Sequence, residues 1–386
     1  MMSKLKFLPN SLKLTMVAAV VTLPLAGLAQ ADTYRIGVMQ ALSGVGETYG
    51  TVQEKAIRMA VDEINAAGGD QFELVVEDSK CNARDAITAY TKLSQVDGIK
   101  AIVGTSCSGA ALGVAPLLAK DKVILISGSN TSPDLTMQGG PYYFRTAPSD
   151  IQVGEIGGKS VYDDGHRKIA FINAATDPSE ALHRVVKRIF TGLGGEFVAA
   201  ERYDTEQLEF RTMVTKVLRS KPEAIFMSHQ DEMQTGNIIK QIKELGYTGP
   251  LYCNDACIGT SALDIAGDAA TGVIAVIPPF IEESNSKGQD FLSKFRDLYG
   301  YTTLEYYMAA AYDATYLLAH CMGEVGSDQD GDALKACLHG VSDYMGAIGG
   351  PYSLGADGDV VGVTMVTVKV LPVSERTVEN FGYQLR

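Results

Sequence analysis

The sequence lacks an excess of positive charge, a long apolar segment beyond its first 31 residues, and the common loop motifs of enzymes. Its 386 residues include 33 Lys and Arg against 46 Asp and Glu. The formal net charge of −13 argues against nucleic acid or an anionic membrane surface as a partner. Neither a G-x-S-x-G nucleophile turn nor a G-x-G-x-x-G nucleotide-binding loop is present. We therefore expect no enzymatic activity and no cofactor.

The one long apolar run lies at the start of the chain. Three lysines precede this run, which extends without charge from Leu14 to Leu28. The residues Ala29-Gln30-Ala31 that follow it fit a signal-peptidase site. It has about 15 residues, short of the ~20 that span a bilayer, and Pro24 interrupts it. We expect residues 1–31 to be a cleaved export signal. The mature chain would begin at Asp32, reach the periplasm and carry a formal charge of −16, because three lysines are lost.

All six cysteines lie after the predicted signal, which suggests disulfides formed in an oxidising compartment. Six cysteines allow 15 pairings. We favour pairs of neighbours along the chain, namely Cys81–Cys107, Cys253–Cys257 and Cys321–Cys337. The alternative is a zinc site built from His320, Cys321, Cys337 and His339, although this spacing matches no zinc-finger pattern.

Short apolar strands alternate with amphipathic helices in two series of about 120 residues each. The strands show little alternation of apolar and polar residues, which is typical of parallel strands buried on both faces. The predicted fold is α/β, with two similar doubly wound lobes joined by crossing hinge strands. We assign residues 32–149 and 279–350 to lobe 1, and residues 150–278 and 351–386 to lobe 2. Near the end of the chain, the alternating segment Val360–Val370 predicts one strand.

Small hydroxylated residues follow three predicted strands of the first series, in residues 41–50, 104–109 and 127–133. Ligands of open α/β sheets bind beyond the carboxyl ends of strands, and backbone N–H groups that open a helix suit a carboxylate. Helix capping would explain any one of these loops, but three neighbouring loops predict a site. Asp231 and Asp255 follow strands of the second series, so a carboxylate would face this site. Such an arrangement is suited to a zwitterion.

Further short motifs recur along the chain in a fixed order. They are Leu42-Ser43-Gly44 with Tyr49-Gly50, Ala66-Ala67-Gly68-Gly69, Glu77-Asp78 before Cys81, Gly104 to Ser108, Thr131-x-Pro133-x-Leu135-Thr136, Phe144-Arg145-Thr146, Ile265-Ala266-Gly267 and Tyr312-Asp313-Ala314. In this order and spacing the chain resembles the periplasmic Leu/Ile/Val-binding protein family. These are type I periplasmic binding proteins of branched-chain amino acid ABC transporters. The resemblance extends to about Leu371, and it implies two lobes that close on a ligand and a membrane ABC permease as partner.

The resemblance also implies roles for individual residues. Ser108, directly after Cys107, would bind the ligand carboxylate. Thr131 would help to hold both charged groups of the ligand. The backbone carbonyl of Ser129 would accept a hydrogen bond from the ligand ammonium, and Asp255, in place of the usual glutamate, would pair with that ammonium.

Tyr49 matches the family's pocket tyrosine, and Cys81–Cys107 matches its disulfide near the site.

Two departures from the family concern the residues that close on the ligand side chain. The family usually places aromatic residues after two strands of the second lobe, where this chain has Thr176 and Asp231. We therefore expect a ligand with a polar or cationic side group that meets Asp231 or Asp177. Helix capping is the alternative role for Asp231.

The predicted function is that of an extracytoplasmic substrate-binding protein of an ABC uptake transporter. It would capture a small zwitterion, an amino acid, by closure of its two lobes. The alternatives are the same fold binding an amide, urea or an aromatic acid, or serving as a sensor. Of the five histidines, only His229 lies at a predicted strand end where it would face the cleft. We expect a monomer.

Overall fold

The computed structural model describes residues 32–44, 46–300, 304–377 and 380–386. The predicted export signal, residues 1–31, lies outside these ranges. Within them, no helix combines the length and apolar character needed to cross a membrane. Residues 32–386 form one compact unit that contains two large sheets and one small sheet.

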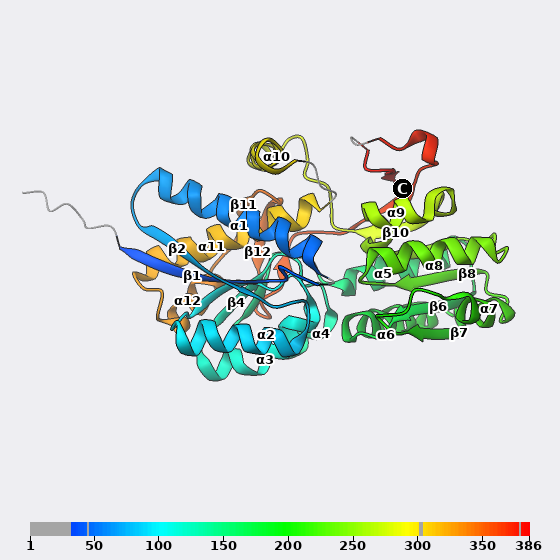
Figure 1. Ribbon diagram of the computed structural model, residues 1–386, viewed down its shortest axis with the longest axis horizontal. Coiled ribbons are helices and arrows are strands. Elements are labelled where there is room, and N and C mark those ends of the chain that lie inside the picture. Colours follow the sequence, from blue (N-terminus) through cyan, green and yellow to red (C-terminus); the bar gives the residue numbers. More distant parts are fainter. Residues whose placement is uncertain (1–31, 45, 301–303, 378–379) are drawn as a thin grey trace, which may run out of the picture. The chain divides into compact units, whose positions relative to one another are not determined.

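The first sheet has five parallel strands in the order β2-β1-β3-β4-β5. Its elements are β1 (Thr33–Gln40), α1 (Glu47–Ala67), β2 (Gln71–Asp78), α2 (Ala83–Thr91) with a π-helical turn at Lys92–Val96, β3 (Ala101–Gly104), α3 (Ser108–Asp121), β4 (Ile124–Ser127), α4 (Pro133–Gln138) and β5 (Tyr143–Arg145). In Figure 1, α1 lies on one side of this sheet and α2 and α3 on the other. The chain passes from β1 to β2 and then returns past β1 to β3. The strand order therefore reverses between β1 and β3, which is where open α/β sheets bind ligands.

The second sheet has seven strands in the order β15-β14-β10-β9-β8-β6-β7. Strands β6 to β10 are parallel, whereas β14 and β15 are antiparallel additions at one edge. Its first elements are α5 (Asp150–Asp163), β6 (Lys168–Ala174), α6 (Asp177–Gly192), β7 (Glu196–Tyr203), α7 (Arg211–Arg219), β8 (Ala224–Ser228), α8 (Glu232–Glu244), β9 (Leu251–Asn254), a 3-10 turn (Asp255–Cys257), α9 (Thr260–Ala266), a second 3-10 turn (Gly267–Ala270) and β10 (Ile274–Ile277). Here the strand order reverses between β6 and β8.

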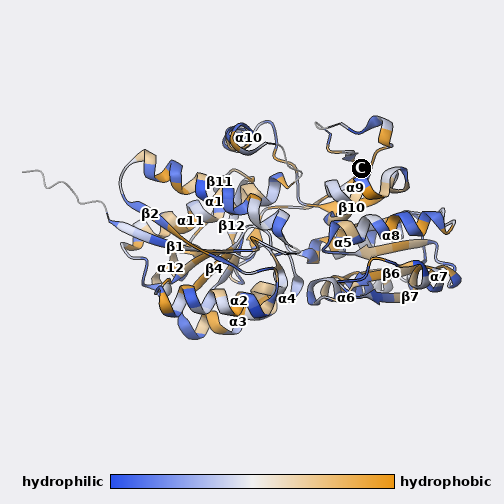
Figure 2. Ribbon diagram, in the orientation of Figure 1, coloured by the Kyte–Doolittle hydropathy of each residue, from blue (hydrophilic) through white to orange (hydrophobic). Residues whose placement is uncertain are grey.

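Helices cover both faces of the second sheet. On strand β8, Ile225 and Met227 pack with α7, α8 and α9, whereas Ala224 and Phe226 pack with α5 and α6 on the opposite face. All five residues of β8 are buried. Figure 2 shows β10 as hydrophobic and α8 as a mixture of hydrophobic and hydrophilic residues. This division confirms the predicted α/β fold with doubly wound sheets.

After β10 the chain returns to the first sheet and then goes back to the second. The returning elements are α10 (Ser286–Tyr299), α11 (Glu305–Val325), α12 (Gly331–His339), β11 (Tyr344–Gly346), β12 (Gly349–Leu354) and β13 (Val360–Val361), and the last ones are β14 (Val366–Val370), a 3-10 turn (Val373–Glu375) and β15 (Tyr383–Leu385). Strands β11, β12 and β13 form the small sheet. The predicted single strand Val360–Val370 is therefore wrong. Gly362 has a φ of +101°, which an extended strand does not contain, and the two halves join different sheets.

Hydrophobic clusters indicate where the chain passes between the two large sheets. The cluster around the first sheet includes residues up to Ala147 and again from Ile281 to Val360, and the clusters around the second sheet take up the rest. We propose hinge segments at residues 147–153, 277–281 and 360–365. The predicted boundary at residue 350 then moves, because Tyr352 and Leu354 are buried in the first cluster. We propose that residues 351–361 belong to lobe 1.

The structure contains the three predicted disulfides, Cys81–Cys107, Cys253–Cys257 and Cys321–Cys337. The first joins the loop after β2 to the residue before α3, the second brackets the turn after β9, and the third joins α11 to α12. The alternative zinc site of His320, Cys321, Cys337 and His339 is excluded, because both of its cysteines form the third disulfide.

Candidate ligand-binding site

The loops beyond β1, β3 and β4 are held to one another by hydrogen bonds. The hydroxyl of Ser106 accepts from the backbone N–H of Ala41 at 3.0 Å, and Ser129 Oγ donates to the carbonyl of Ser106 at 3.0 Å. Ser127 Oγ donates to the carbonyl of Thr105 at 2.8 Å. Several small hydroxyls of these loops therefore fix the loops themselves. The result is a wall whose remaining polar groups are held in place.

The start of α3 is the part of this wall best suited to an anion. Ser108 is the first residue of the helix, Cys107 occupies the N-cap, and no side chain caps the free N–H groups. Such a helix start carries partial positive charge. Ser108 Oγ accepts from the backbone N–H of Ser132 at 3.2 Å, so its own O–H is available to a ligand. A Cβ built on Gly46 would lie 2.6 Å from the Cys107 sulfur, so α1 approaches this disulfide closely.

A pocket with about 700 Å³ of space between atoms, its opening included, lies against this wall. We call it the polar pocket; its lining is Gly46, Tyr49, Cys81, Ser106, Cys107, Ser108, Ser129, Thr131, Asp150, Pro178, Ser179, Ser228, His229, Gln230, Asn254, Asp255, Ala256 and Tyr307. Six of the eight residues predicted from the sequence are among them: Tyr49, Cys107, Ser108, Ser129, Thr131 and Asp255. Both large sheets contribute, at the edge where their parallel strands end.

Asp255 enters the pocket from the turn after β9, between the two cysteines of the second disulfide. Its carboxylate accepts from the phenol of Tyr307 at 2.6 Å and from the side-chain amide of Asn254 at 3.1 Å. Burial raises the pKa of Asp255, although both hydrogen bonds oppose the shift. An incoming ammonium would therefore meet a buried carboxylate that gains from a positive partner.

Asp150 is a second carboxylate of the pocket, and the sequence interpretation missed it. It begins α5, and its side chain accepts from the hydroxyl of Thr131 at 2.9 Å. Burial raises its pKa to about 7, helped by the negative charge of Asp255 and opposed by Thr131 and the cation of Arg145. Strand β5, which precedes it, has only three residues, so no strand end was predicted there. Because its O–H donates to Asp150, Thr131 offers a ligand its oxygen as an acceptor.

Two predicted residues do not line the polar pocket. Asp231 occupies the N-cap of α8, where its side chain accepts from the backbone N–H of Gln234 at 2.7 Å. This is the capping role considered as the alternative for this residue. Thr176 is the N-cap of α6, and Asp177, also considered from the sequence, is exposed at the start of that helix. We do not carry these three residues into the proposed site.

The second sheet presents neutral polar groups where its strand order reverses. Ser179 lies in the first turn of α6, after β6, and His229 directly follows β8. Both line the polar pocket and both are nearly fully buried, with exposed fractions of 2% and 1%. The sequence interpretation considered His229 but not Ser179. Ser179 lies three residues beyond the position where an aromatic was expected.

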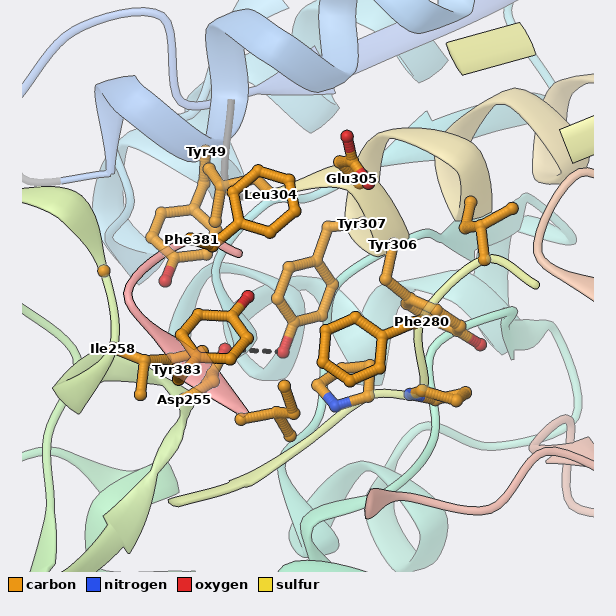
Figure 3. A pocket seen from close by; sticks show the side chains of 15 residues that line it. Tyr49, Asp255, Ile258, Phe280, Leu304, Glu305, Tyr306, Tyr307, Phe381 and Tyr383 are labelled. Atoms are coloured by element: carbon orange, nitrogen blue, oxygen red, sulfur yellow. Dashed lines mark hydrogen bonds between the residues drawn. The ribbon is translucent and has the colours of Figure 1, made fainter. Parts of the chain in front are cut away.

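A second pocket, which we call the aromatic pocket, adjoins the first and shares Tyr49, Asp255 and Tyr307 with it (Figure 3). It has about 570 Å³ of space between atoms, its opening included. Its other residues are Ile258, Gly259, Ile277, Pro278, Pro279, Phe280, Ile281, Leu304, Glu305, Tyr306, Phe381 and Tyr383. The rings of Phe280 and Tyr383 stack at 5.9 Å between centroids. The hydrogen bond from Tyr307 to Asp255, dashed in Figure 3, lies where the two pockets meet.

Neither pocket has a Lys or Arg in its lining, as far as the described residues show. The nearby cation of Arg145 is fully buried and paired with Asp359, with two contacts of 2.7 Å, and it also donates to the carbonyls of Asn130 and Ser132. It braces the loop after β4. An anion in the polar pocket would therefore depend on neutral hydrogen-bond donors.

Comparisons with known proteins agree with this geometry. The sequence model of the family described as periplasmic binding protein matches residues 33–370. A leucine-, isoleucine-, valine-, threonine- and alanine-binding protein of Pseudomonas aeruginosa is 26% identical over 319 residues, which cover 79% of this chain and 83% of that protein.

Solved structures show the same fold. The branched-chain amino acid transporter substrate-binding protein LivJ of Streptococcus pneumoniae, in complex with isoleucine, has a TM-score of 0.76 at 26% identity, covering 88% of this chain and 96% of that one. An ABC transporter solute-binding protein of R. palustris, in complex with benzoate, has a TM-score of 0.78 at 20% identity and covers 87% and 93%.

The family match spans nearly all of the described chain, and the two sheets meet at a pocket built from their strand ends. A pocket between the strand ends of two sheets is what a binding protein needs to hold a ligand, and holding a ligand requires no chemical reaction. The prediction that the chain is not an enzyme is confirmed by the family it matches. This chain belongs to the periplasmic binding protein family.

Proposed function

We propose that this protein is the solute-binding component of an ABC uptake transporter and that it captures a free α-amino acid in the polar pocket. The relative from P. aeruginosa is named for binding amino acids, and the S. pneumoniae structure contains isoleucine. These similarities favour an amino acid as the ligand. The geometry of this chain's own pocket supports the proposal independently.

The observation that carries the proposal is the opposition of two groups across one pocket. The uncapped start of α3, with Ser108, attracts a carboxylate, and the buried Asp255 attracts an ammonium. The carbonyl of Ser129 and the hydroxyl oxygen of Thr131 add acceptors for the ammonium. A zwitterion satisfies both ends, whereas a simple cation or anion leaves one end without a partner.

The groups that would bind the two ends of the ligand come from different sheets, which favours closure of the two lobes around it. Ser108 belongs to the first sheet and Asp255 to the second, so the ligand would bridge them and stabilise the closed form. Contacts between the lobes already exist in this structure. Tyr307 on α11 donates to Asp255, and Arg184 on α6 donates to both carboxylate oxygens of Asp134 on α4 at 2.8 Å. A membrane permease would then recognise the closed form.

Isothermal titration with matched ligands tests the proposal. An L-amino acid that binds should lose at least about 100-fold in affinity when its carboxylate is converted to a methyl ester, and similarly when its amine is replaced by a hydroxyl, because each change leaves buried groups unpaired. The control is Asp231→Asn, which keeps an amide cap on α8 and should bind normally. Equal affinity for the amino acid and its hydroxy acid would refute the zwitterion assignment.

An aromatic acid is the second candidate ligand, because the aromatic pocket adjoins the polar one and a relative from R. palustris was crystallised with benzoate. Two carboxylates and the absence of a basic side chain from the described lining weigh against a ligand whose only charge is negative. Benzoate and 4-hydroxybenzoate belong in the same titration series. Tight binding of these acids, with no binding of amino acids, would replace the first proposal by this one.

The cellular location and partners complete the proposal. We propose export to the periplasm by the signal in residues 1–31, capture of ligand by a monomer, and delivery to a membrane ABC permease. Mass spectrometry of the protein recovered from the periplasm should give a chain that begins at Asp32. An intact amino terminus would contradict cleavage at this site.

A further inference from the structure

The second-lobe wall of the polar pocket contains two buried polar groups that no other group of the described chain satisfies. The hydroxyl of Ser179 and Nε2 of His229 have no hydrogen-bond partner there. Both lie beside the reversal of strand order between β6 and β8, where a ligand is expected. Buried polar groups are hydrogen-bonded in nearly all native proteins. Of the described buried groups without a partner, Ser179 and His229 are the two that line the polar pocket, so a bound ligand is their candidate partner.

The surroundings of His229 fix which of its ring nitrogens carries the proton. Its backbone N–H donates to Asn254 Oδ1 at 3.1 Å, and its carbonyl accepts from Asn254 Nδ2 at 2.9 Å, so the residue is held from both sides. Nδ1 lies 2.6 Å from the phenol of Tyr203. Within the described chain, this phenol has no other acceptor for its proton. We therefore assign the Tyr203 O–H as donor to Nδ1, which places the ring proton on Nε2.

The ring of His229 is uncharged. Burial lowers its pKa to about 3, and within the described residues no carboxylate is a hydrogen-bond partner of Nε2. His229 thus has one neutral N–H donor without a partner in the described chain, and Ser179 has a hydroxyl that both donates and accepts. A neutral ligand group with both an acceptor and a donor would supply a partner to each of these two residues of the pocket lining.

We infer that Ser179 and His229 select a ligand whose side chain carries a carboxamide, as in asparagine or glutamine. The amide oxygen accepts from His229 Nε2–H, and the amide NH₂ donates to Ser179 Oγ. This inference rests on the proposed function, because the amino and carboxyl groups of the ligand must occupy Asp255 and the start of α3. An aliphatic side chain at this wall would leave both polar groups buried and unpaired.

Ser179 and His229 lie near the two positions that lack the expected aromatics. The family resemblance predicts aromatic residues at positions 176 and 231, which hold Thr and Asp in this chain. Ser179 and His229 follow the same two strands. The wall that would contact an aliphatic side chain is therefore polar here.

The first test needs only the wild-type protein. Its dissociation constants for near-isosteric pairs, asparagine with leucine and glutamine with methionine, are measured by isothermal titration. We expect the amide member of at least one pair to bind about 10- to 100-fold more tightly, because an apolar analogue leaves buried polar groups unpaired. If leucine and methionine bind as tightly as both amides, the inference is wrong and the amino acid proposal stands. If no amino acid binds, both are wrong.

Two variants and two matched controls locate the effect. Ser179→Ala and His229→Phe should each weaken amide binding about 10-fold or more and bring the two members of the pair to within about threefold of each other. His229→Gln, which restores an N–H donor, should recover part of the preference. Ser79→Ala and His183→Phe remove equally unpartnered buried groups that do not line the polar pocket, and they should leave the preference unchanged.

Circular dichroism melting of each variant shows whether it has folded. If His229→Phe does not fold, Ser179→Ala and the ligand pairs still decide the question. An amide preference that persists in both folded variants would place the recognition elsewhere and overturn the inference.

Discussion

Asp150 gives the unliganded protein a pH dependence whose size follows from its surroundings. Its exposed fraction is 8%, and burial together with the charge of Asp255 raises its pKa to about 7. In the unfolded chain an aspartate has a pKa of about 3.9. Between these two values the unfolded chain has lost the proton and the native protein keeps it. The free energy of unfolding therefore decreases as the pH rises from about 4 to about 7, and the contribution of Asp150 is fully lost above that range.

The difference of about three pH units corresponds to at most about 4 kcal/mol, at 1.36 kcal/mol per unit. Asp150→Asn removes this contribution because its amide does not titrate. Urea unfolding of both proteins at about pH 5 and about pH 8 should show that the wild type loses more stability than the variant on going to the higher pH. Other buried groups titrate in or near this range, including Asp313 with a pKa raised to about 6. Groups that do not interact with Asp150 are common to both proteins, so they cancel in the comparison.

Asp231→Asn is the control, since it changes a carboxylate that caps α8 and does not line the pocket. It should follow the wild type at both pH values. If Asp150→Asn also follows the wild type, Asp150 does not keep its proton in the native protein, and the picture of two interacting buried carboxylates is wrong.

Three further predictions concern single contacts. Asp255→Ala should weaken amino acid binding at least about 100-fold in a titration, because the ligand ammonium loses its buried partner; binding within about threefold of the wild type would remove Asp255 from the site. Asp359→Ala should reduce the free energy of unfolding by about 3–5 kcal/mol in urea, since it leaves the fully buried Arg145 without its carboxylate; a loss below about 1 kcal/mol would contradict this account. Replacing Cys321 and Cys337 together by serine should cost about 3 kcal/mol by the same assay, because the bond closes a loop with a sequence separation of 16; an unchanged midpoint would show that α11 and α12 hold together without it.

The sequence predicted well those features that repeat or that depend on local chemistry. Parallel strands such as β3 and β4 are apolar at nearly every position, so the doubly wound fold was visible. The loops with Ser108 and Thr131 stood out because small hydroxylated residues cluster after strands. The disulfides joined neighbours along the chain, as predicted.

The sequence did not show which side chains the folded chain brings into the pocket. Asp150 follows a strand of only three residues, and Tyr307 lies inside the helix α11, where nothing distinguishes it from its buried neighbours. Asp231 has the same residue type and strand-end position as Asp255, yet it caps a helix. Ser179 was missed because a serine in the first turn of a helix has no distinctive sequence signal.

The passages of the chain between the two large sheets affect how the protein can fold while it is being made. The strands of the first sheet are complete by Arg145, but α11, which packs in the same hydrophobic cluster, begins only at Glu305. A growing chain therefore holds apolar residues of its first sheet uncovered while more than a hundred further residues are added. The hydrophobic cluster around each large sheet draws on separated segments of the chain. A fragment that ends after β10 should aggregate even though it contains every parallel strand, and folding should be completed only when the last third of the chain arrives.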